Sequence, residues 1–256
     1  MTCASQFRWA SSARTDAGRV REINEDACLD QPDAGRWAVA DGMGGHAVGD
    51  LASRLVIDAL DQLPPTAGVA HGLAQTRAQL LDANRQLREE AARRQVQRIG
   101  STVVVLFACD RFCSYLWAGD SRIYLYRDGK LRKLTRDHSH VEELRALGLL
   151  TEEEARSHPA HNVITRAVGA ADQLDLDEDT IEVADGDVFL LCSDGLSNEI
   201  TDAEILATLA STDCQRASVE LVDLALARGG RDNITAVVVQ AEDPHGSDKT
   251  LLNPSS

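Results

Sequence analysis

Residues 102–134 read TVVVLFACDRFCSYLWAGDSRIYLYRDGKLRKL, and this stretch decides the fold class. Its β-branched and aromatic residues fall into runs of strand length with only a few residues between them. These runs are 102–109, 112–118 and 123–127. Asp128-Gly129 then favours a tight hairpin turn into a fourth run at 130–134. Because strands joined by hairpins pair antiparallel, the stretch predicts antiparallel pairing of consecutive strands.

Further strands and helices lie on both sides of this stretch in blocks rather than in strict alternation. A short apolar strand and two amphipathic helices precede it, at 37–40, 50–63 and about 69–95. The elements that follow it are strands at 180–183 and 188–192, a helix opened by the capping box Thr201–Glu204, a helix over about 215–228 and a last strand at 234–240. Such blocks predict an α+β fold in which helix pairs cover two antiparallel sheets.

One segment interrupts this pattern. Residues 138–162 are polar, hold four of the seven histidines and carry a Thr151–Glu154 capping box ahead of a short helix. We expect this segment to be an inserted flap. Because there is no internal repeat and no clear linker, we expect one domain over 1–241, followed by a polar, disordered tail at 242–256.

Composition narrows the class of protein. The net charge of −15 argues against a nucleic-acid partner, because phosphate backbones are bound through basic patches. The first residues lack the apolar core of a signal peptide, and no stretch approaches the ~20 apolar residues of a membrane helix. We therefore expect no membrane association, a cytoplasmic location and a monomer.

The cysteines are scattered, and no CxxC pair occurs among them. They are Cys3, Cys28, Cys109, Cys113, Cys192 and Cys214. This pattern is typical of free thiols in a reducing compartment, where cysteine behaves as a small buried hydrophobe. Cys109 and Cys113 are expected to be core or turn residues.

Four aspartates share one local setting, in which a strand meets a turn beside glycine. They are Asp41, Asp120, Asp194 and Asp232. One such aspartate is usually only part of a turn, but four of them together with Glu25-Asp26 indicate a site. Carboxylates gathered at one sheet edge repel one another unless a hard cation neutralises them.

The same residues resemble the motifs of a known family. The motifs are Arg21-Glu22-Ile23-Asn24-Glu25-Asp26, Asp41-Gly42-Met43-Gly44-Gly45-His46, Ala118-Gly119-Asp120-Ser121-Arg122, Ser193-Asp194-Gly195-Leu196 and Arg231-Asp232-Asn233-Ile234-Thr235. Their order and spacing, over about residues 8–240, resemble a bacterial member of the metal-dependent protein phosphatases (the PPM group, type 2C Ser/Thr phosphatases). The resemblance implies a four-layer αββα sandwich with a binuclear metal centre at one end.

The resemblance also implies ligands for two Mn²⁺ or Mg²⁺ ions. Asp41 would bridge both ions. Asp194 and Asp232 would complete one site, and the Gly42 carbonyl with Glu25 would serve the other.

Further roles follow from the same comparison. Asp26 would act mainly through metal-bound water, and Asp120 matches a position associated with a third, weaker metal. Arg21 matches the arginine that binds the substrate phosphate. Some members carry a histidine directly after the Asp-Gly that protonates the leaving group, but this chain has Met43 there; His46 and a water near Asp120 remain alternative donors.

The chemistry is coherent with these residues. Two cations about 3.5–4 Å apart lower the pKa of a bridging water and clamp an in-line displacement, and arginine offers a bidentate fork to phosphate. All-oxygen ligands favour Mg²⁺ or Mn²⁺. The expected reaction is hydrolysis of phosphoserine and phosphothreonine in proteins, opposing a Ser/Thr protein kinase. A small-molecule phosphoesterase and a pseudophosphatase that only binds phosphoproteins remain alternatives.

Two other patterns resemble metal sites. Asp175, Asp177 and Asp179 mimic the start of a calcium loop, but Thr180 and Gly186 occupy the positions that need glycine and glutamate. The flap histidines suggest zinc, yet no cysteine or carboxylate completes a known spacing, so we interpret them as part of a polar flap. These histidines are His138, His140, His158 and His161.

Overall fold

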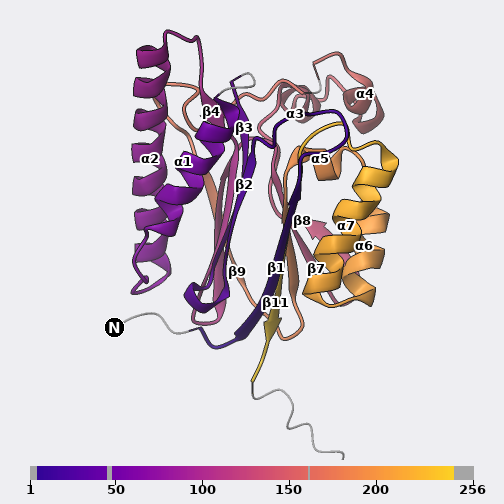
Figure 1. Cartoon of the computed structure of the whole chain (residues 1–256). Coiled ribbons are helices and arrows are strands. Elements are labelled where there is room, and N and C mark those ends of the chain that lie inside the picture. Colours follow the sequence, from indigo (N-terminus) through magenta and orange to yellow (C-terminus); the bar gives the residue numbers. More distant parts are fainter. Residues whose placement is uncertain (1–4, 45–47, 161, 245–256) are drawn as a thin grey trace, which may run out of the picture.

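The computed structural model describes residues 5–44, 48–160 and 162–244. Two antiparallel β-sheets pack face to face, and a pair of helices covers the outer face of each sheet (Figure 1). This arrangement confirms the α+β class and the four-layer αββα sandwich.

The two sheets have different strand orders. One is β1 (Arg8–Asp16), β11 (Ile234–Glu242), β10 (Val188–Cys192), β7 (Arg122–Arg127) and β8 (Lys130–Lys133). The other is β2 (Asp26–Gln31), β3 (Arg36–Met43), β5 (Val103–Cys109), β6 (Phe112–Ala118) and β9 (Asp177–Glu182), with β4 (Gly100–Ser101) paired to β3. The sequence pattern did not define the bounds of β1 or β2. Both are edge strands, so many of their side chains are only half-buried and their apolar pattern is weak.

The stretch 102–134 is divided between the two sheets. β5 pairs with β6 and β7 pairs with β8, as expected, but β6 and β7 do not pair with each other. The chain instead crosses from one sheet to the other at Gly119–Ser121, where Gly119 has a φ of 115°. The prediction that consecutive strands of this stretch pair antiparallel is therefore wrong for β6 and β7. The crossing places Asp120 where the two sheets meet.

The covering helices lie close to their expected positions. They are α1 (Gly49–Asp61) and α2 (Val69–Arg94) on one side and α6 (Asp202–Ser211) and α7 (Cys214–Arg228) on the other. The Thr201–Glu204 capping box is present, and its Thr201 side chain accepts a hydrogen bond from the Glu204 N–H. A capping box is a contact between residues three apart, so sequence alone could predict it.

The segment between β8 and β9 forms the flap. It contains two short helices, α3 (His140–Ala146) and α4 (Glu152–Ser157), and the second begins with the Thr151–Glu154 capping box. In Figure 1 both helices lie at the same end of the sandwich as α5 (Asp194–Ser197). Residues 245–256, most of the segment expected to be a tail, lie outside the described residues.

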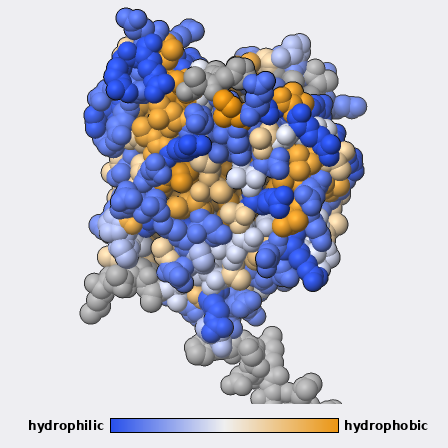
Figure 2. All heavy atoms as spheres, viewed as in Figure 1, coloured by the Kyte–Doolittle hydropathy of each residue, from blue (hydrophilic) through white to orange (hydrophobic). Residues whose placement is uncertain are grey.

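Apolar side chains fill the space between the layers. Three large side chains lie between the two sheets and are fully buried: Trp37, Leu106 and Phe189. Leu80 of α2 and Leu221 of α7 lie in the outer layers, between these helices and the sheets. Hydrophilic residues cover most of the face shown in Figure 2. The sandwich therefore has three apolar layers, and the functional groups must lie at its ends or surface.

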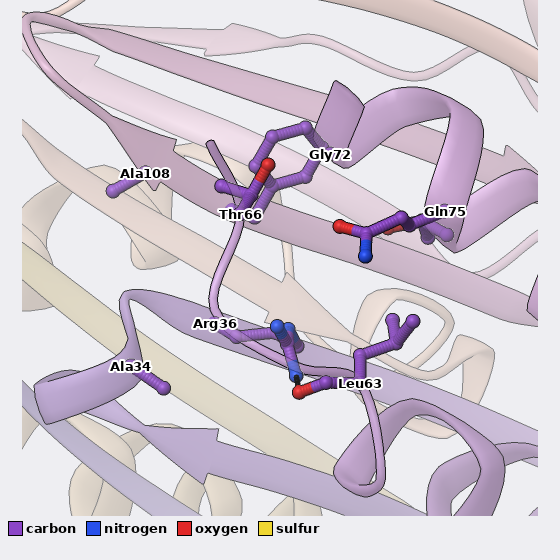
Figure 3. A pocket seen from close by; sticks show the side chains of 9 residues that line it. Ala34, Arg36, Leu63, Thr66, Gly72, Gln75 and Ala108 are labelled. Atoms are coloured by element: carbon purple, nitrogen blue, oxygen red, sulfur yellow. Dashed lines mark hydrogen bonds between the residues drawn. The ribbon is translucent and has the colours of Figure 1, made fainter. Parts of the chain in front are cut away.

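Arg36, at the opposite end of β3 from Asp41, lines a small cavity between the loop after α1, helix α2 and β5 (Figure 3). Its guanidinium donates to the carbonyls of Leu60 and Leu63, both at 3.0 Å, and thus caps the end of α1. Burial lowers the pKa of Arg36. The cavity measures about 10 Å³, which is room for one water molecule. It is too small for a substrate.

The cysteines differ from expectation at one position. Cys109 is disulfide-bonded, so the interpretation of all the cysteines as free thiols was wrong for this residue. The four other described cysteines are free: Cys28, Cys113, Cys192 and Cys214. Cys3 lies outside the described residues.

In the described part of the chain, no helix is both long and apolar enough to cross a membrane.

Candidate metal centre

The hairpin of β2 and β3 brings four of the predicted residues to one sheet end. Asp26 and Asp41 are register partners in the two strands. The Gly42 N–H donates to the Glu25 carbonyl at 3.0 Å, so these two residues are also adjacent. Antiparallel pairing thus joins residues that are about fifteen positions apart in sequence.

The other sheet contributes two further aspartates. Asp194 follows β10 and opens α5, while Asp232 lies just before β11. Because β10 and β11 pair, with Cys192 opposite Ala236, both aspartates lie at the same end of their sheet. Asp120 comes from the crossing between the sheets. The carboxylates of Asp26, Asp120, Asp194 and Asp232 all act electrostatically on Asp41. The structure therefore brings these five aspartates together.

This crowding raises the pKa values of four carboxyls. Burial is the main cause in each case, and neighbouring carboxylates add to it. The pKa rises to about 7 for Asp26 and to about 8 for Asp120. The pKa of Asp41 lies well above its usual range, and that of Asp194 is also raised. Positive groups of the protein therefore do not offset the cost of burying these carboxylates together.

Two oxygens of this cluster are buried without a hydrogen-bond donor. They are Glu25 Oε1 and Asp26 Oδ1, and the only other such side-chain atom among the described residues is Trp37 Nε1. The second oxygen of Asp26 accepts from Ser193 Oγ and Thr235 Oγ1, each at 2.7 Å. Buried carboxylate oxygens normally have a donor or a cation beside them. An all-oxygen donor set with open oxygens fits Mg²⁺ or Mn²⁺.

The carboxylate side chains of this cluster are not arranged as a coordination sphere. Within the described ranges, no three His, Cys, Asp or Glu side chains are arranged around one point as metal ligands would be. Asp232 is instead paired with Arg21, whose Nη2 lies 2.8 Å from Asp232 Oδ2. The carboxyl groups of Asp194 and Asp41 also interact with each other. Side-chain rotations that break these two contacts would free the carboxylates for a cation.

Glycine permits the close backbone approach in this region. A Cβ on Gly42 would lie 2.0 Å from the Gly49 carbonyl oxygen, and a Cβ on Gly195 would lie 2.0 Å from that of Asn233. No other residue fits at these two positions without moving the backbone. The Asp-Gly pairs in the sequence therefore reflect packing at the site.

Arg21 lies on the loop between β1 and β2, and its side chain is 42% exposed. Its pairing with Asp232 raises the already high pKa of the guanidinium. It is thus a charged, accessible group beside the carboxylates. Met43 ends β3 and carries no proton to donate, whereas His46 lies outside the described residues.

Some residues of the site were quoted in the motifs but given no role. Asn233 accepts from the Glu25 N–H at 2.8 Å and donates to the carbonyls of Ala17 and Ile23, both at 2.9 Å, so it fixes the loop that carries Arg21. Ser193 and Thr235 hold Asp26. Their place in the motifs could have indicated these roles: Ser193 directly precedes Asp194, and Asn233 and Thr235 follow Asp232.

The flap histidines need one correction. His138 is the first residue of the flap, but it is buried, hydrogen-bonded to the crossing turn and close to Asp177, so its side chain is not one of the solvated polar groups expected there. The reason is tertiary: the stacked ring of Trp117 covers it. His161 lies outside the described residues.

The raised pKa values predict how stability depends on pH without metal. The folded protein keeps protons on these carboxyls that the unfolded chain loses above its ordinary pKa of about 3.8, so stability must fall as pH rises. His138, whose pKa is lowered by burial, opposes this fall only below its ordinary value of 6.5. We therefore expect the melting temperature in EDTA to fall between about pH 6.5 and pH 8, and manganese to reduce the fall. A melting temperature that rises over this range in EDTA would contradict the assignment.

Fold and site together define a class of protein. A two-sheet sandwich with buried carboxylates from both sheets at one end, and an exposed arginine beside them, is the arrangement of metal-dependent phosphatases. Comparison with known proteins agrees with this class. The family model described as protein phosphatase 2C matches residues 16–227.

Solved structures share the fold. PppA, a key regulatory component of T6SS in Pseudomonas aeruginosa, aligns with a TM-score of 0.86 and 44% identity, over 94% of this chain and 100% of that one. The catalytic domain of the serine/threonine protein phosphatase PstP in complex with two manganese ions aligns with a TM-score of 0.82 and 35% identity, over 93% of this chain and 100% of that one.

Curated relatives give the same result. The serine/threonine protein phosphatase PstP of Mycobacterium tuberculosis is 38% identical over 247 residues, which is 94% of this chain but 47% of PstP, so this chain spans about half the length of that relative. Protein phosphatase PhpP of Streptococcus pneumoniae is 36% identical over 239 residues, which is 91% of this chain and 97% of PhpP. The chain belongs to the protein phosphatase 2C family.

Proposed function

We propose that this chain hydrolyses phosphoserine and phosphothreonine in proteins, with Mn²⁺ or Mg²⁺ held by the acidic cluster. The observation that carries the proposal is the meeting of buried carboxylates from both sheets beside Arg21, in a chain of this family. Such a cluster is unfavourable unless cations neutralise it.

The cluster divides into ligands for two ions. Asp41 lies at its centre and would contact both. Asp194 and Asp232, from the five-stranded sheet, would complete one site. Glu25 and the Gly42 carbonyl, from the β2–β3 hairpin, would complete the other.

Two further carboxylates lie beside these ligands. Asp26 keeps one oxygen engaged by two hydroxyls and leaves the other open, which suits an indirect contact through water. Asp120 lies on the crossing turn and interacts electrostatically with Asp194. It would serve a third, weaker ion.

The bound cations supply an activated water nucleophile near neutral pH and neutralise charge on the phosphoryl group. The chain's own part is to bind and orient the substrate. Arg21 would exchange its contact with Asp232 for two phosphate oxygens, because a guanidinium offers a planar pair of donors. Asn233 keeps the Arg21 loop in place through its two carbonyl contacts. No cysteine or serine acts as the nucleophile, so no phosphoenzyme forms.

The partners follow from this activity. The substrates are phosphorylated proteins, made by a Ser/Thr protein kinase whose action this chain opposes. We further propose that it works as a monomer in the cytoplasm.

A comparison of substrates tests the function. With manganese present, the chain should hydrolyse a phosphothreonine peptide with a much higher kcat/KM than nucleoside monophosphates or sugar phosphates. A preference for the small esters would favour a small-molecule phosphoesterase. Binding of the phosphopeptide without hydrolysis would favour a pseudophosphatase.

Replacing Arg21 by alanine should separate binding from chemistry. Because Arg21 contacts the phosphate and no metal, Arg21→Ala should raise KM for the phosphopeptide more than it lowers kcat. Steady-state kinetics measures both. Arg54→Ala is the matched control, since Arg54 is an exposed arginine of α1 whose side chain is 68% exposed. An unchanged KM with a lost kcat would show that Arg21 serves the reaction step instead.

A further inference from the structure

The first residue of the flap is tied to the turn that carries Asp120. The Gly119 N–H donates to His138 Nδ1 at 3.2 Å, and the His138 N–H donates to the Gly119 carbonyl at 2.8 Å. Both backbone polar groups of Gly119 are thus bound by one residue, nineteen positions away. The position of Asp120 therefore depends on His138.

The imidazole of His138 is held on every side. Its ring is 6% exposed and stacks on Trp117, with ring centroids 6.0 Å apart. Nε2 lies 3.2 Å from Asp177 Oδ2 and 3.4 Å from Arg166 Nη1, and this Arg166 nitrogen donates to the other oxygen of Asp177 at 2.9 Å. Since Nδ1 accepts the Gly119 hydrogen bond, the proton must lie on Nε2, where Asp177 accepts it.

The crossing turn is also linked to Asp41. A Cβ on Gly119 would lie 2.6 Å from the Thr102 side chain, so the turn packs directly against Thr102. The Thr102 hydroxyl contacts Ser121 Oγ at 2.7 Å and accepts from the Asp41 N–H at 3.1 Å. A shift of the turn would therefore alter the position of Asp120 relative to Asp41.

We propose that His138 is a positioning residue, whose neutral Nδ1 fixes the Gly119–Asp120 turn, and that Asp177 selects the required tautomer. This inference rests on the proposed function, because Asp120 matters for turnover only if the acidic cluster is the catalytic centre. The contact acts through the backbone of Gly119, and His138 itself touches neither metal nor substrate.

The flap can remain attached when the imidazole is removed. Arg122 holds the adjacent Asp137 through its Nε, 3.1 Å from both carboxylate oxygens, and through its Nη2, 2.7 Å from Asp137 Oδ2. The Arg122–Asp137 pair is largely buried. Substitutions of His138 should therefore give a folded protein with a looser turn.

Three substitutions of His138 distinguish the contribution of Nδ1 from that of Nε2. His138→Ala removes both contacts, and kcat on the phosphothreonine peptide should fall about 10- to 100-fold, the range for residues that orient ligands. The manganese concentration for half-maximal activity should rise, while KM for the peptide stays unchanged. His138→Asn should recover most of the activity, because Asn Oδ1 can accept from the Gly119 N–H. His138→Gln, which reaches only toward Asp177, should not recover it.

One control variant and one further test variant complete the series. His71→Asn changes an exposed histidine of α2 and should leave kcat and the manganese dependence unchanged. Asp177→Asn can donate to Nε2 and so push the proton to Nδ1, which then faces the Gly119 N–H. Its kcat should fall in the same direction as that of His138→Ala.

A measurement without turnover separates this inference from the proposed function. Nitrogen-15 NMR of the imidazole should show Nδ1 unprotonated and Nε2 protonated, and the Gly119 amide should exchange slowly in the wild type and fast in His138→Ala. A protonated Nδ1 would overturn the inference. So would wild-type kcat in His138→Ala, or equal losses in the Ala and Asn variants with melting temperatures like the wild type. Failure of the wild type to hydrolyse the peptide would refute the proposed function alone.

Discussion

Replacing Asp41 by asparagine should lower kcat on a phosphothreonine peptide by at least ~10³-fold, the scale of key electrostatic groups in active sites. Asp41 ends β3 and interacts with carboxylates from both sheets, namely Asp26, Asp120, Asp194 and Asp232. In the proposed centre Asp41 would contact both ions, so no neighbouring carboxylate could take its place. The amide has nearly the same shape but lacks the negative charge that a shared cation ligand needs.

A second measurement on the same variant excludes misfolding. Because burial raises the pKa of Asp41 well above its usual range, the ionised side chain destabilises the metal-free protein. Asp41→Asn removes this charge, so in EDTA at pH 8 it should melt at a higher temperature than the wild type. Asp58→Asn, an exposed change on α1, is the control and should alter neither property. Activity within tenfold of the wild type would remove Asp41 from the centre of the site.

Removing divalent cations should abolish the activity. The cluster offers only oxygen ligands, two of them buried without donors, so a hard cation is the partner it fits. After dialysis against EDTA, with metal loss confirmed by elemental analysis, phosphopeptide hydrolysis should fall to background. Manganese or magnesium should restore it, and calcium should restore it poorly, because its larger radius and flexible geometry suit a two-ion clamp less well.

Thiol reagents provide the contrasting treatment. Burial raises the pKa of Cys28 to about 11 and that of Cys192 to about 12, so neither thiol is reactive at neutral pH. Brief alkylation should therefore leave activity unchanged. Full activity in the verified metal-free protein, or its loss on alkylation, would refute the metal mechanism.

Local features could be predicted from the sequence because their causes are local. The Thr151–Glu154 and Thr201–Glu204 capping boxes join residues three apart, and both are present. The strand-end aspartates lie beside glycines that permit close packing, and the structure brings these aspartates together. Chain order and motif spacing were sufficient to predict the αββα class and the acidic cluster.

Other features depended on contacts between distant residues. The sequence of 102–134 reads as one run of hairpins, yet packing of two sheets divides it at Gly119. Asp26 is held by Thr235, 209 positions away, and hydroxyl-bearing residues are too common for such a partner to be recognised locally. His138 has an ordinary polar sequence around it, and only the fold places it between Trp117 and Asp177. The sequence alone thus determined which carboxylates to expect together at one end of the sandwich, whereas tertiary structure decided which side chains orient them, because orienting contacts join segments that only folding brings together.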